Sequence, residues 1–407
     1  MHSRTHKALF PILRRLSDGR FHSGEALAQA FGLSRASIFN VISQAEAMGL
    51  TIHAVRGRGY RLPEPVEWLD ADAIVQRLGD VASAYTLQLN DSVESTNTAL
   101  MAAALAGAAD GTVCSSEHQH AGKGRRGRPW HSVPGGSLTF STLWRFDNGL
   151  QSLAGLSLAA GLAIARAVNR HSAHPVRLKW PNDVLVDYRK LAGILVEVQG
   201  DMNGAAFAVV GIGLNVRLNA AQRDAVDQAV VDLAEMGVTV GRNLLLADCL
   251  RELHAVLVLF RQHGFAALRA DWLALDAYAG KPVALSLPDA RTVHGMAAGV
   301  DETGAFLLRD AASNPSGGAG LTAGIGAGMG IGNLMQQATS GAMQGQQSGG
   351  AKPAGIPDVM TPSEAASILK VSEEDVMAAI KDKSLKAKKM GNAYRISKSA
   401  LEEFMNS

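Results

Sequence analysis

A short basic loop is the stretch of this sequence best suited to chemistry. Residues 122–130 read Gly-Lys-Gly-Arg-Arg-Gly-Arg-Pro-Trp. The three glycines allow positive φ angles and a close approach of the backbone to a ligand, while four cationic side chains leave the same segment. Such a loop is suited to enclosing an anion such as a phosphate. The alternative is a flexible basic surface loop that touches nucleic acid.

A second set of polar residues follows the loop. Residues 179–183 read Lys-Trp-Pro-Asn-Asp, and after a turn residues 189–197 read Arg-Lys-Leu-Ala-Gly-Ile-Leu-Val-Glu. The basic loop lacks the order of a P-loop, because no Gly-Lys-Ser/Thr ends it and no strong helix pattern follows it. We therefore expect the loop to fold over a phosphate rather than to hold one at a helix N-terminus.

Together these segments resemble the catalytic core of the biotin protein ligases. In that family a glycine- and arginine-rich loop, a Lys-Trp-Pro-Asn-Asp segment and an Arg-Lys-(Leu/Val)-Ala-Gly-Ile-Leu segment recur in this order. Ser95-Thr96-Asn97 upstream and residues 211–216, Gly-Ile-Gly-Leu-Asn-Val, downstream fit the same pattern. The resemblance covers roughly residues 90–216 and implies that the chain is a biotin protein ligase.

The resemblance implies a reaction in two steps. Biotin and ATP first form biotinyl-5′-adenylate and release pyrophosphate, and a lysine amine of a biotin carboxyl carrier protein of acetyl-CoA carboxylase then attacks the adenylate. Because the biotin carboxylate and the α-phosphate carry charges of like sign, the first step needs nearby cations. ATP and biotin are the expected substrates, and Mg²⁺ is expected with the nucleotide.

The resemblance also assigns roles to individual residues. The cations expected at the reacting atoms are Lys190, Arg125 and Lys179. The positions expected to bind biotin and the adenylate are Ser95, Thr96, Asn97, Gln119, Lys123, Gly124, Arg125 and Lys190. Trp130 and Asn215 are expected beside the adenine, and Asn182 and Asp183 are expected to orient the nucleotide or Mg²⁺, with no metal site built by the protein alone.

Each assignment has a plainer alternative. Ser95 and Thr96 could serve only as a helix cap, Trp130 could be ordinary core, and the Asn182-Asp183 turn could be structural. Lys190 and Lys179 could be solvated surface lysines. Lys123 stands where the family often has arginine, a change that keeps the charge and loses bidentate geometry.

Length and composition indicate several domains and a reducing compartment. The chain has 407 residues, of which 47% are hydrophobic and 19% charged, and its net charge is +2. Two cysteines, Cys114 and Cys249, are too few for a disulfide framework, so we expect a cytoplasmic protein. We expect no secretory signal and no membrane contact; the glycine-rich residues 317–335 come nearest to a membrane-spanning composition.

Residues 1–63 are predicted to form a winged helix-turn-helix domain that binds operator DNA. Three short helical patterns, two of them starting at Ser23 and Ser34, are followed by two short strands joined by Arg-Gly-Arg-Gly. The residues expected at the DNA are Ser34, Arg35, Ser37, Asn40, Arg56 and Arg58. One class of biotin protein ligases has such a domain and acts as the repressor of the biotin operon, as a homodimer in our expectation. The alternative is a small helical interaction module.

The rest of the chain is predicted to be multidomain α+β. Residues 68–276 should form an α+β domain with a mixed sheet. This domain should include an amphipathic helix over residues 152–169. Residues 279–312 should form a truncated SH3-like barrel without its last strand, and residues 313–357 a disordered Gly- and Gln-rich linker. Residues 358–407 resemble an excisionase-like helix-turn-helix module, which is foreign to the ligase pattern and indicates a fusion or a chimeric gene model.

Two other functions compete with the leading one of a ligase with an added repressor activity. The first is a DNA-binding regulator that only senses biotinyl-AMP, with its ligase activity impaired by the altered barrel. The second is lipoyl or octanoyl transfer, which the basic glycine loop and the Lys-Trp-Pro-Asn-Asp segment together disfavour.

Overall fold

The chain forms two compact units, residues 1–343 and residues 344–407, which are described separately. The structure is a computed structural model, and it describes residues 2–287, 291–309 and 321–325 of the first unit. In the second unit it describes residues 359–360, 362, 376–377, 379–380, 385–390, 393–397 and 400.

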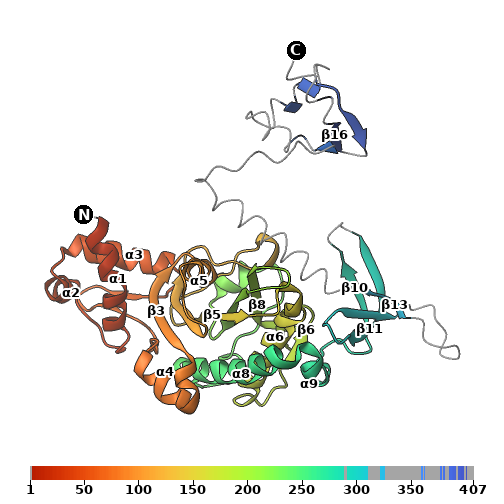
Figure 1. Cartoon of the computed structure of the whole chain (residues 1–407). Helices are drawn as coiled ribbons and strands as arrows, with labels where there is room; N and C mark the ends of the chain where they lie inside the picture. Colours follow the sequence, from red (N-terminus) through yellow and green to blue (C-terminus); the bar gives the residue numbers. More distant parts are fainter. Residues whose placement is uncertain are drawn as a thin grey trace. The chain divides into compact units, whose positions relative to one another are not determined.

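The first five elements form a winged helix (Figure 1). Helices α1 (His2–Leu16), α2 (Gly24–Phe31) and α3 (Arg35–Ala47) precede the hairpin of β1 (His53–Val55) and β2 (Gly59–Arg61). The predicted caps are confirmed, because Ser23 Oγ accepts a hydrogen bond from Ala26 N and Ser34 Oγ accepts one from Ser37 N, both at 3.0 Å. Apolar residues of the three helices form a core of their own.

A seven-stranded sheet, the central sheet, follows the winged helix. Its strand order is β3-β4-β5-β9-β8-β7-β6; only β3 and β4 are parallel, so the predicted mixed sheet is confirmed. Its strands are β3 (Thr86–Val93), β4 (Thr112–Gln119), β5 (Ser137–Phe146), β6 (Arg177–Lys179), β7 (Asp183–Val186), β8 (Arg189–Gly200) and β9 (Ala206–Asn215).

Helices cover both faces of the central sheet. On β9, Val209 belongs to a small cluster with α5 (Thr96–Leu105), whereas Ala208 and Val210 belong to the main core with α6 (Leu156–Asn169) and α8 (Arg242–His263). Because side chains alternate along a strand, Gly211 and Gly213 face the side of α5. The other helices are α4 (Ala71–Leu78), α7 (Ala220–Asp224) and α9 (Arg269–Ala274), with 3-10 turns at Gly79–Ala84, Arg125–Gly127, Leu150–Leu153 and Phe265–Leu268.

Helix α6 was predicted to be amphipathic, and this was wrong. It is buried on nearly every side, because it lies between the central sheet and α8. Among the described residues, the segment Leu150–Asn169 is long and apolar enough to cross a membrane by length and composition, but 67% of its apolar window is buried inside the fold. Its burial identifies it as a core helix. Residues 317–335, which we expect to come nearest to a membrane-spanning composition, lie outside the described residues apart from Leu321–Ile325.

A four-stranded antiparallel sheet, the small sheet, follows α9. Its strands pair in chain order: β10 (Pro282–Ser286), β11 (Thr292–Val300), β12 (Phe306–Arg309) and β13 (Leu321–Ile325). The expectation that the last strand is missing was wrong, because β13 pairs with β12 inside the range assigned to the linker. An edge strand such as β13 is held by backbone hydrogen bonds, which do not depend on side chains, so a glycine-rich segment can form one. Closure of this sheet into a barrel stays a prediction, and the rest of the proposed linker lies outside the described residues.

The second unit contains a hairpin of β15 (Lys388–Met390) and β16 (Ala393–Ser397), which confirms the basic hairpin predicted there. Strand β14 (Val359–Met360) pairs with the other edge of β16. Val376, Ile380, Leu385 and Ile396 form its described core. The expected helix starts at Thr361 and Ser372 lie outside the described residues.

Candidate functional site

The basic loop is an ordered hairpin. Trp130 N donates to Gly122 O at 2.8 Å and Gly124 N donates to Arg128 O at 2.7 Å, so the two arms of the loop pair. Arg126 and Gly127, with φ angles of 57° and 72°, make the tip. The next element along the chain is strand β5, not a helix, and the folding of the loop over a ligand stays a prediction.

Two neighbouring pockets, which share several lining residues, lie beside this loop. The wider one, with a volume of about 620 Å³, is lined by the loop, by the Lys179–Asp183 segment and by Lys190 and Asn215. The narrower one, of about 60 Å³, is lined by Ser95, Thr96, Asn97, Gln119 and Lys123. Gly124, Arg125, Trp130, Asn182 and Lys190 line both. The structure therefore brings together all the ligand-binding residues expected from the sequence, apart from the DNA-binding set.

Buried polar groups form the narrow pocket. Thr96 N and Oγ1 both donate to Gln119 Oε1, at 2.7 and 3.1 Å, and Ser141 Oγ donates to Asn97 Oδ1 at 2.6 Å. Asn97 Nδ2 in turn donates to Glu197 Oε2 at 2.7 Å. Ser95 stands at the N-cap position of α5 without a capping side-chain hydrogen bond, so the alternative that it serves only as a cap is wrong.

Glycines on the central sheet leave room for this arrangement. A Cβ atom on Gly211 would lie 2.0 Å from Asn97 Oδ1, and one on Gly213 would lie 2.2 Å from the indole of Trp130. Gly193 pairs with Gly213 across β8 and β9. Any side chain at Gly211 or Gly213 would displace a group that lines the pocket.

The wide pocket has cations on two sides. Lys190 Nζ lies 2.8 Å from Asp183 Oδ1 and 5.8 Å from the centroid of the Trp130 ring. Lys179 lines the same pocket from β6. Trp130 is half-buried against Gly213 and lines the pocket, so it is more than a core residue. Asn215 donates its amide to Lys190 O and Val231 O at 3.3 and 3.1 Å, so it also fixes the backbone beside Lys190.

Arg125 links the loop to the Trp-Pro-Asn-Asp turn. Its guanidinium donates to Asn182 Oδ1 at 3.0 Å, and Asn182 Nδ2 donates to Ile194 O at 2.8 Å. Burial and the neighbouring charge of Arg126 lower the pKa of Arg125, and the charge of Asp183 opposes them. An anion bound here would relieve the cost of keeping this guanidinium charged. Asn182 thus has a structural role as well as a place in the pocket.

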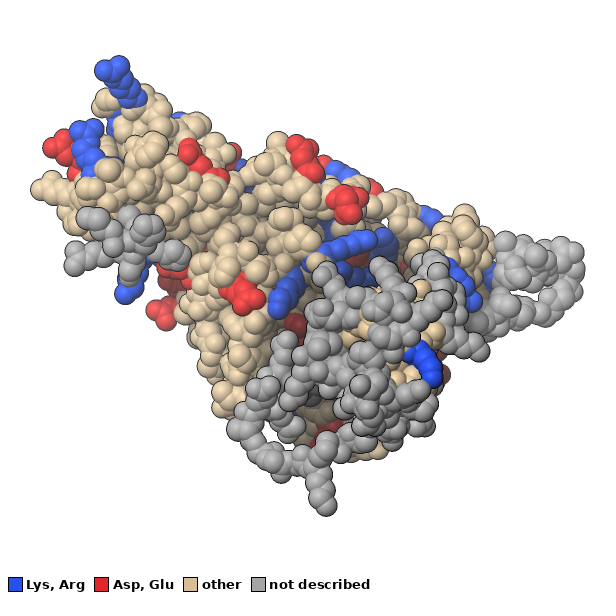
Figure 2. All heavy atoms as spheres, turned by 90° about the horizontal axis from the view of Figure 1, so that it is seen from above, with Lys and Arg blue, Asp and Glu red and all other residues tan. Residues whose placement is uncertain are grey.

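Lysine, arginine and acidic side chains are unevenly spread over the surface. In Figure 2 the Lys and Arg side chains form a curved group near the middle of the face shown, while acidic side chains are scattered around it. Lys123, Arg126 and Arg128 of the basic loop are exposed, and Lys123 Nζ donates to Thr98 Oγ1 at 2.8 Å. The loop therefore offers three exposed cations and one partly buried cation, Arg125.

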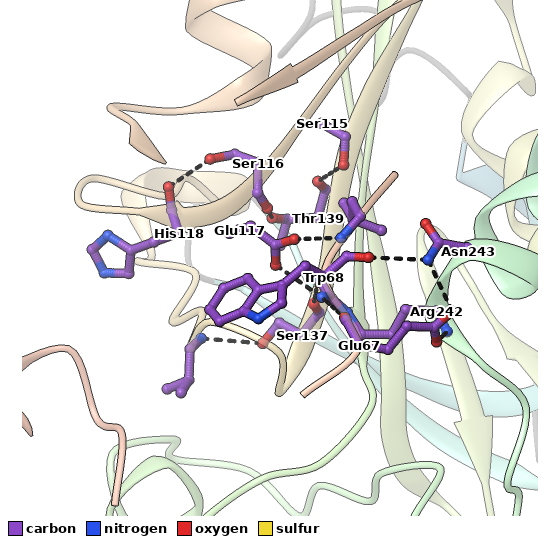
Figure 3. Close-up of polar contacts among 12 residues, drawn as sticks. Glu67, Trp68, Ser115, Ser116, Glu117, His118, Ser137, Thr139, Arg242 and Asn243 are labelled. Atoms are coloured by element: carbon purple, nitrogen blue, oxygen red, sulfur yellow. Dashed lines mark hydrogen bonds and ion pairs between the residues drawn. The ribbon is translucent and has the colours of Figure 1, made fainter. Parts of the chain in front are cut away.

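A buried ion pair, unrecognised in the sequence, fixes the segment that leads from the winged helix to the central sheet (Figure 3). Arg242 and Glu117 are 2.8 Å apart with side chains only 4% and 3% exposed. Arg242 also donates to Glu67 O at 2.8 Å, and Glu117 Oε1 accepts from Leu69 N at 2.7 Å. Asn243 Nδ2 donates to Trp68 O at 3.0 Å. No local sequence pattern signals these contacts, since the partners are far apart in the chain.

Trp68 connects this junction to the winged helix. Its Nε1 donates to Ser17 Oγ at 2.8 Å, and its ring meets Phe10 edge to face at 6.1 Å and Arg14 at 5.3 Å. The linker expected around residues 63–65 is therefore followed, at Trp68, by a residue that packs against the winged helix.

The expected DNA-binding residues lie on α3 and on the β1–β2 hairpin. Ser34 and Ser37 hydrogen-bond to each other at 2.9 Å in the helix cap, so their hydroxyls have a structural role. Arg35, Asn40, Arg56 and Arg58 are exposed. The guanidinium of Arg58 lies 4.3 Å from the centroid of the Phe21 ring. Contacts of these residues with DNA stay predictions.

Profiles of known families match four parts of the chain. The Biotin/lipoate A/B protein ligase family matches residues 89–215, and the biotin protein ligase C-terminal domain matches residues 278–320. A helix-turn-helix domain matches residues 9–61, and a second one of another type matches residues 359–407. The second match supports the predicted C-terminal module.

Individual relatives in sequence also point to the biotin protein ligases. The bifunctional ligase/repressor BirA of Salmonella typhimurium is 39% identical over 297 residues, which cover 73% of this chain and 91% of that protein. The biotin–[acetyl-CoA-carboxylase] ligase of Mycobacterium tuberculosis is 39% identical over 220 residues, 53% of this chain and 79% of the relative. Among solved structures, the Aquifex aeolicus biotin protein ligase with biotin and ATP is 28% identical, covers 56% of this chain and 92% of that chain, and has a TM-score of 0.48. The extent and identity of the match to the Salmonella protein place this chain in the biotin protein ligase family, among the bifunctional ligase/repressors.

Proposed function

We propose that the chain activates biotin with ATP to biotinyl-5′-AMP and transfers the biotinyl group to a lysine of a biotin carboxyl carrier protein of acetyl-CoA carboxylase. The observation that carries this proposal is the convergence of Arg125, Lys190 and Lys179 on a wide pocket that shares lining residues with a narrow polar one. This arrangement suits a ligand that has a small polar head and an anionic reacting end.

The narrow pocket suits the ureido head of biotin. A ureido group is neutral and has both hydrogen-bond donors and acceptors, so it needs hydroxyl and amide partners. Ser95, Thr96, Asn97 and Gln119 provide them, and all four are buried. Asn97 is held in place by the protein itself, because its Oδ1 accepts from Ser141 Oγ and its Nδ2 donates to Glu197 Oε2 and Leu195 O.

The wide pocket suits the phosphates and the adenosine. A carboxylate oxygen of biotin attacks the α-phosphorus, the bond to the bridging oxygen breaks, and pyrophosphate leaves. Arg125 and Lys190 offset the negative charge at the two reacting groups, and Trp130 offers a flat face to the adenine. In the second step the acceptor amine attacks the acyl carbon, loses its proton, and AMP departs.

Mg²⁺ would be bound mainly through the phosphates of ATP. The carboxylates that line the wide pocket are Asp183 and Asp227, and one oxygen of Asp183 is already paired with Lys190. This donor set suits Mg²⁺ held by phosphates, water and one carboxylate. The ion would neutralise charge on the leaving pyrophosphate.

Replacement of Lys190 by Gln tests the catalytic proposal. Loss of a cation that acts in the transition state should lower biotin-dependent ATP–pyrophosphate exchange by about 10²- to 10³-fold with an unchanged Tm. Lys281→Gln is the matched control, because Lys281 also lies over an aromatic ring, that of Tyr188, but outside both pockets. Exchange near the wild-type rate in Lys190→Gln would contradict the role given to Lys190.

Replacement of Arg125 by Ala separates the two ligands. A lost charge-assisted contact costs about 1.5 to 3 kcal/mol, and this contact forms chiefly when a phosphate is present. Calorimetry should therefore show a larger loss of affinity for biotinyl-5′-AMP than for biotin. Equal losses would refute the idea that Arg125 meets the phosphate.

We also propose that the winged helix makes the chain a biotin-responsive repressor, acting as a dimer in the cytoplasm. The support is the exposed basic set on α3 and the hairpin, together with the anchored junction that ties it to the ligand-binding part. A gel-shift assay with the full chain should show tighter binding to the promoter of its biotin genes when biotin and ATP are present. The rival proposal, a regulator that senses biotinyl-AMP with impaired ligase activity, requires that pyrophosphate exchange be almost absent.

A further inference from the structure

The exposed face of α3 carries one large apolar side chain. Phe39 is 61% exposed, although Ile38, Val41, Ile42 and Ala45 of the same helix are buried in the winged-helix core. Leaving an aromatic ring in water forgoes the stabilisation that burial would give. A ring in this place is therefore suited to a contact that forms only when a partner binds.

The helical period places Phe39 at the centre of a polar and cationic face. At 100° per residue, Arg35, Phe39 and Ser43 follow one another along the helix, with Ala36 and Asn40 beside them. All five are exposed, and they face away from the core. The wing adds Arg56 and Arg58, both exposed.

The charges of the winged helix select the partner of Phe39. On α3, Arg35 lies one turn before Phe39 and Glu46 two turns after it, and the wing adds the exposed Arg56 and Arg58. The net charge of these four residues is positive, which favours a polyanion over an apolar protein surface. A helix that follows a helix-turn-helix bend fits the major groove, and there the 5-methyl group of thymine is the apolar feature that a side chain can meet.

We propose that Phe39 determines sequence specificity by packing against the 5-methyl group of a thymine in the major groove. The proposal rests on DNA binding by the winged helix and adds the base and the group that this residue reads. Asn40 and Arg35, on either side, are placed for the neighbouring base edges, and Phe39 supplies discrimination by contact and shape rather than by a hydrogen bond.

The test uses the full chain with biotin and ATP and duplexes with a randomised core. The wild type should enrich a thymine at a fixed position, and replacing that thymidine by deoxyuridine should weaken binding about fourfold, the equilibrium factor for burying one methyl group. Phe39→Ala should lose the enrichment at that position and bind both duplexes equally. Leu105→Ala is the matched control, because Leu105 on α5 is also 61% exposed and lies outside the winged helix.

The outcomes separate this inference from the repressor proposal. If the wild type enriches no sequence, both fail. If it enriches a sequence but Phe39→Ala keeps the same base preference and the same response to deoxyuridine, only the role of Phe39 is refuted. A change in the oligomeric state of Phe39→Ala without a change in base preference would likewise refute it and indicate a protein partner for the ring.

Discussion

Replacement of Arg242 by Met should destabilise the first unit by several kcal/mol. The side chain is 4% exposed and donates to Glu67 O at 2.8 Å and to Ser137 O at 3.0 Å, besides its 2.8 Å ion pair with Glu117. Methionine fills much of the space but leaves Glu117 as a buried carboxylate without its cation. Removing one partner of such a pair costs about 3–5 kcal/mol.

The expected cost becomes a large shift in melting temperature. For a cooperative unit of this size each kcal/mol moves Tm by about 2–4 °C, so Arg242→Met should lower it by roughly 6–20 °C. Differential scanning calorimetry is the suitable assay, because it resolves the transitions of separate units. Arg166→Met serves as the control, since the Arg166–Asp271 pair is 36% and 56% exposed and should contribute less than about 1 kcal/mol.

A double-mutant cycle decides whether the ion pair is the cause. Glu117→Gln alone should also destabilise, because it leaves Arg242 as an uncompensated buried cation. The double variant has neither charge, so its loss should be smaller than the sum of the single losses by about 0.5–3 kcal/mol. Strictly additive losses, or single losses as small as that of Arg166→Met, would refute the reasoning.

Three further outcomes follow from the described geometry. Gly213→Ala should displace the Trp130 indole, which would lie 2.2 Å from the new Cβ, and so lower pyrophosphate exchange, whereas Gly24→Ala, whose nearest neighbour is 3.5 Å away, should not. Burial and the nearby His120 lower the pKa of His118 to about 4. The unfolded chain therefore binds more protons than the folded chain below pH ~6.5, so the free energy of unfolding should fall as the pH drops from there towards 4. In urea titrations at several pH values, His118→Gln should flatten that fall. Burial raises the pKa of Cys114 to about 11 and also raises that of Cys249. At neutral pH a thiol reagent should therefore label neither cysteine in the folded protein and both after unfolding. Rapid labelling of the folded chain would contradict their burial.

Local signals in the sequence were enough for the winged helix and for the members of the site. Ser23 and Ser34 indicate helix starts, because a capping side chain bonds to a backbone N–H only three residues further on. The family motifs identified the pocket residues, and the structure brings them together. What the motifs did not supply is how they are held: Ser141 and Glu197 fix Asn97 from other strands, and only the pairing of β5, β8 and β9 brings them there.

Long-range pairing also explains the errors. Composition predicted a disordered linker over residues 313–357, yet β13 lies within that range and pairs with β12 through backbone groups, which composition does not encode. The apolar pattern over residues 152–169 predicts an amphipathic helix with one buried face. In the structure α8 and the central sheet cover α6 on two sides, and this depends on the order of the strands. The alternating glycines Gly211 and Gly213 were the one available signal for a ligand-facing strand, since they lie on the same face.

The junction at Trp68 has a consequence for synthesis on the ribosome. The winged helix has its own core and is complete once Leu62 has left the ribosome, but Asn243, which holds the Trp68 carbonyl, is made 175 residues after it. At about 5–20 residues per second the interval is roughly 10–35 s. During translation each nascent chain therefore exposes a finished winged helix for this interval before Asn243 can fix the junction that follows it.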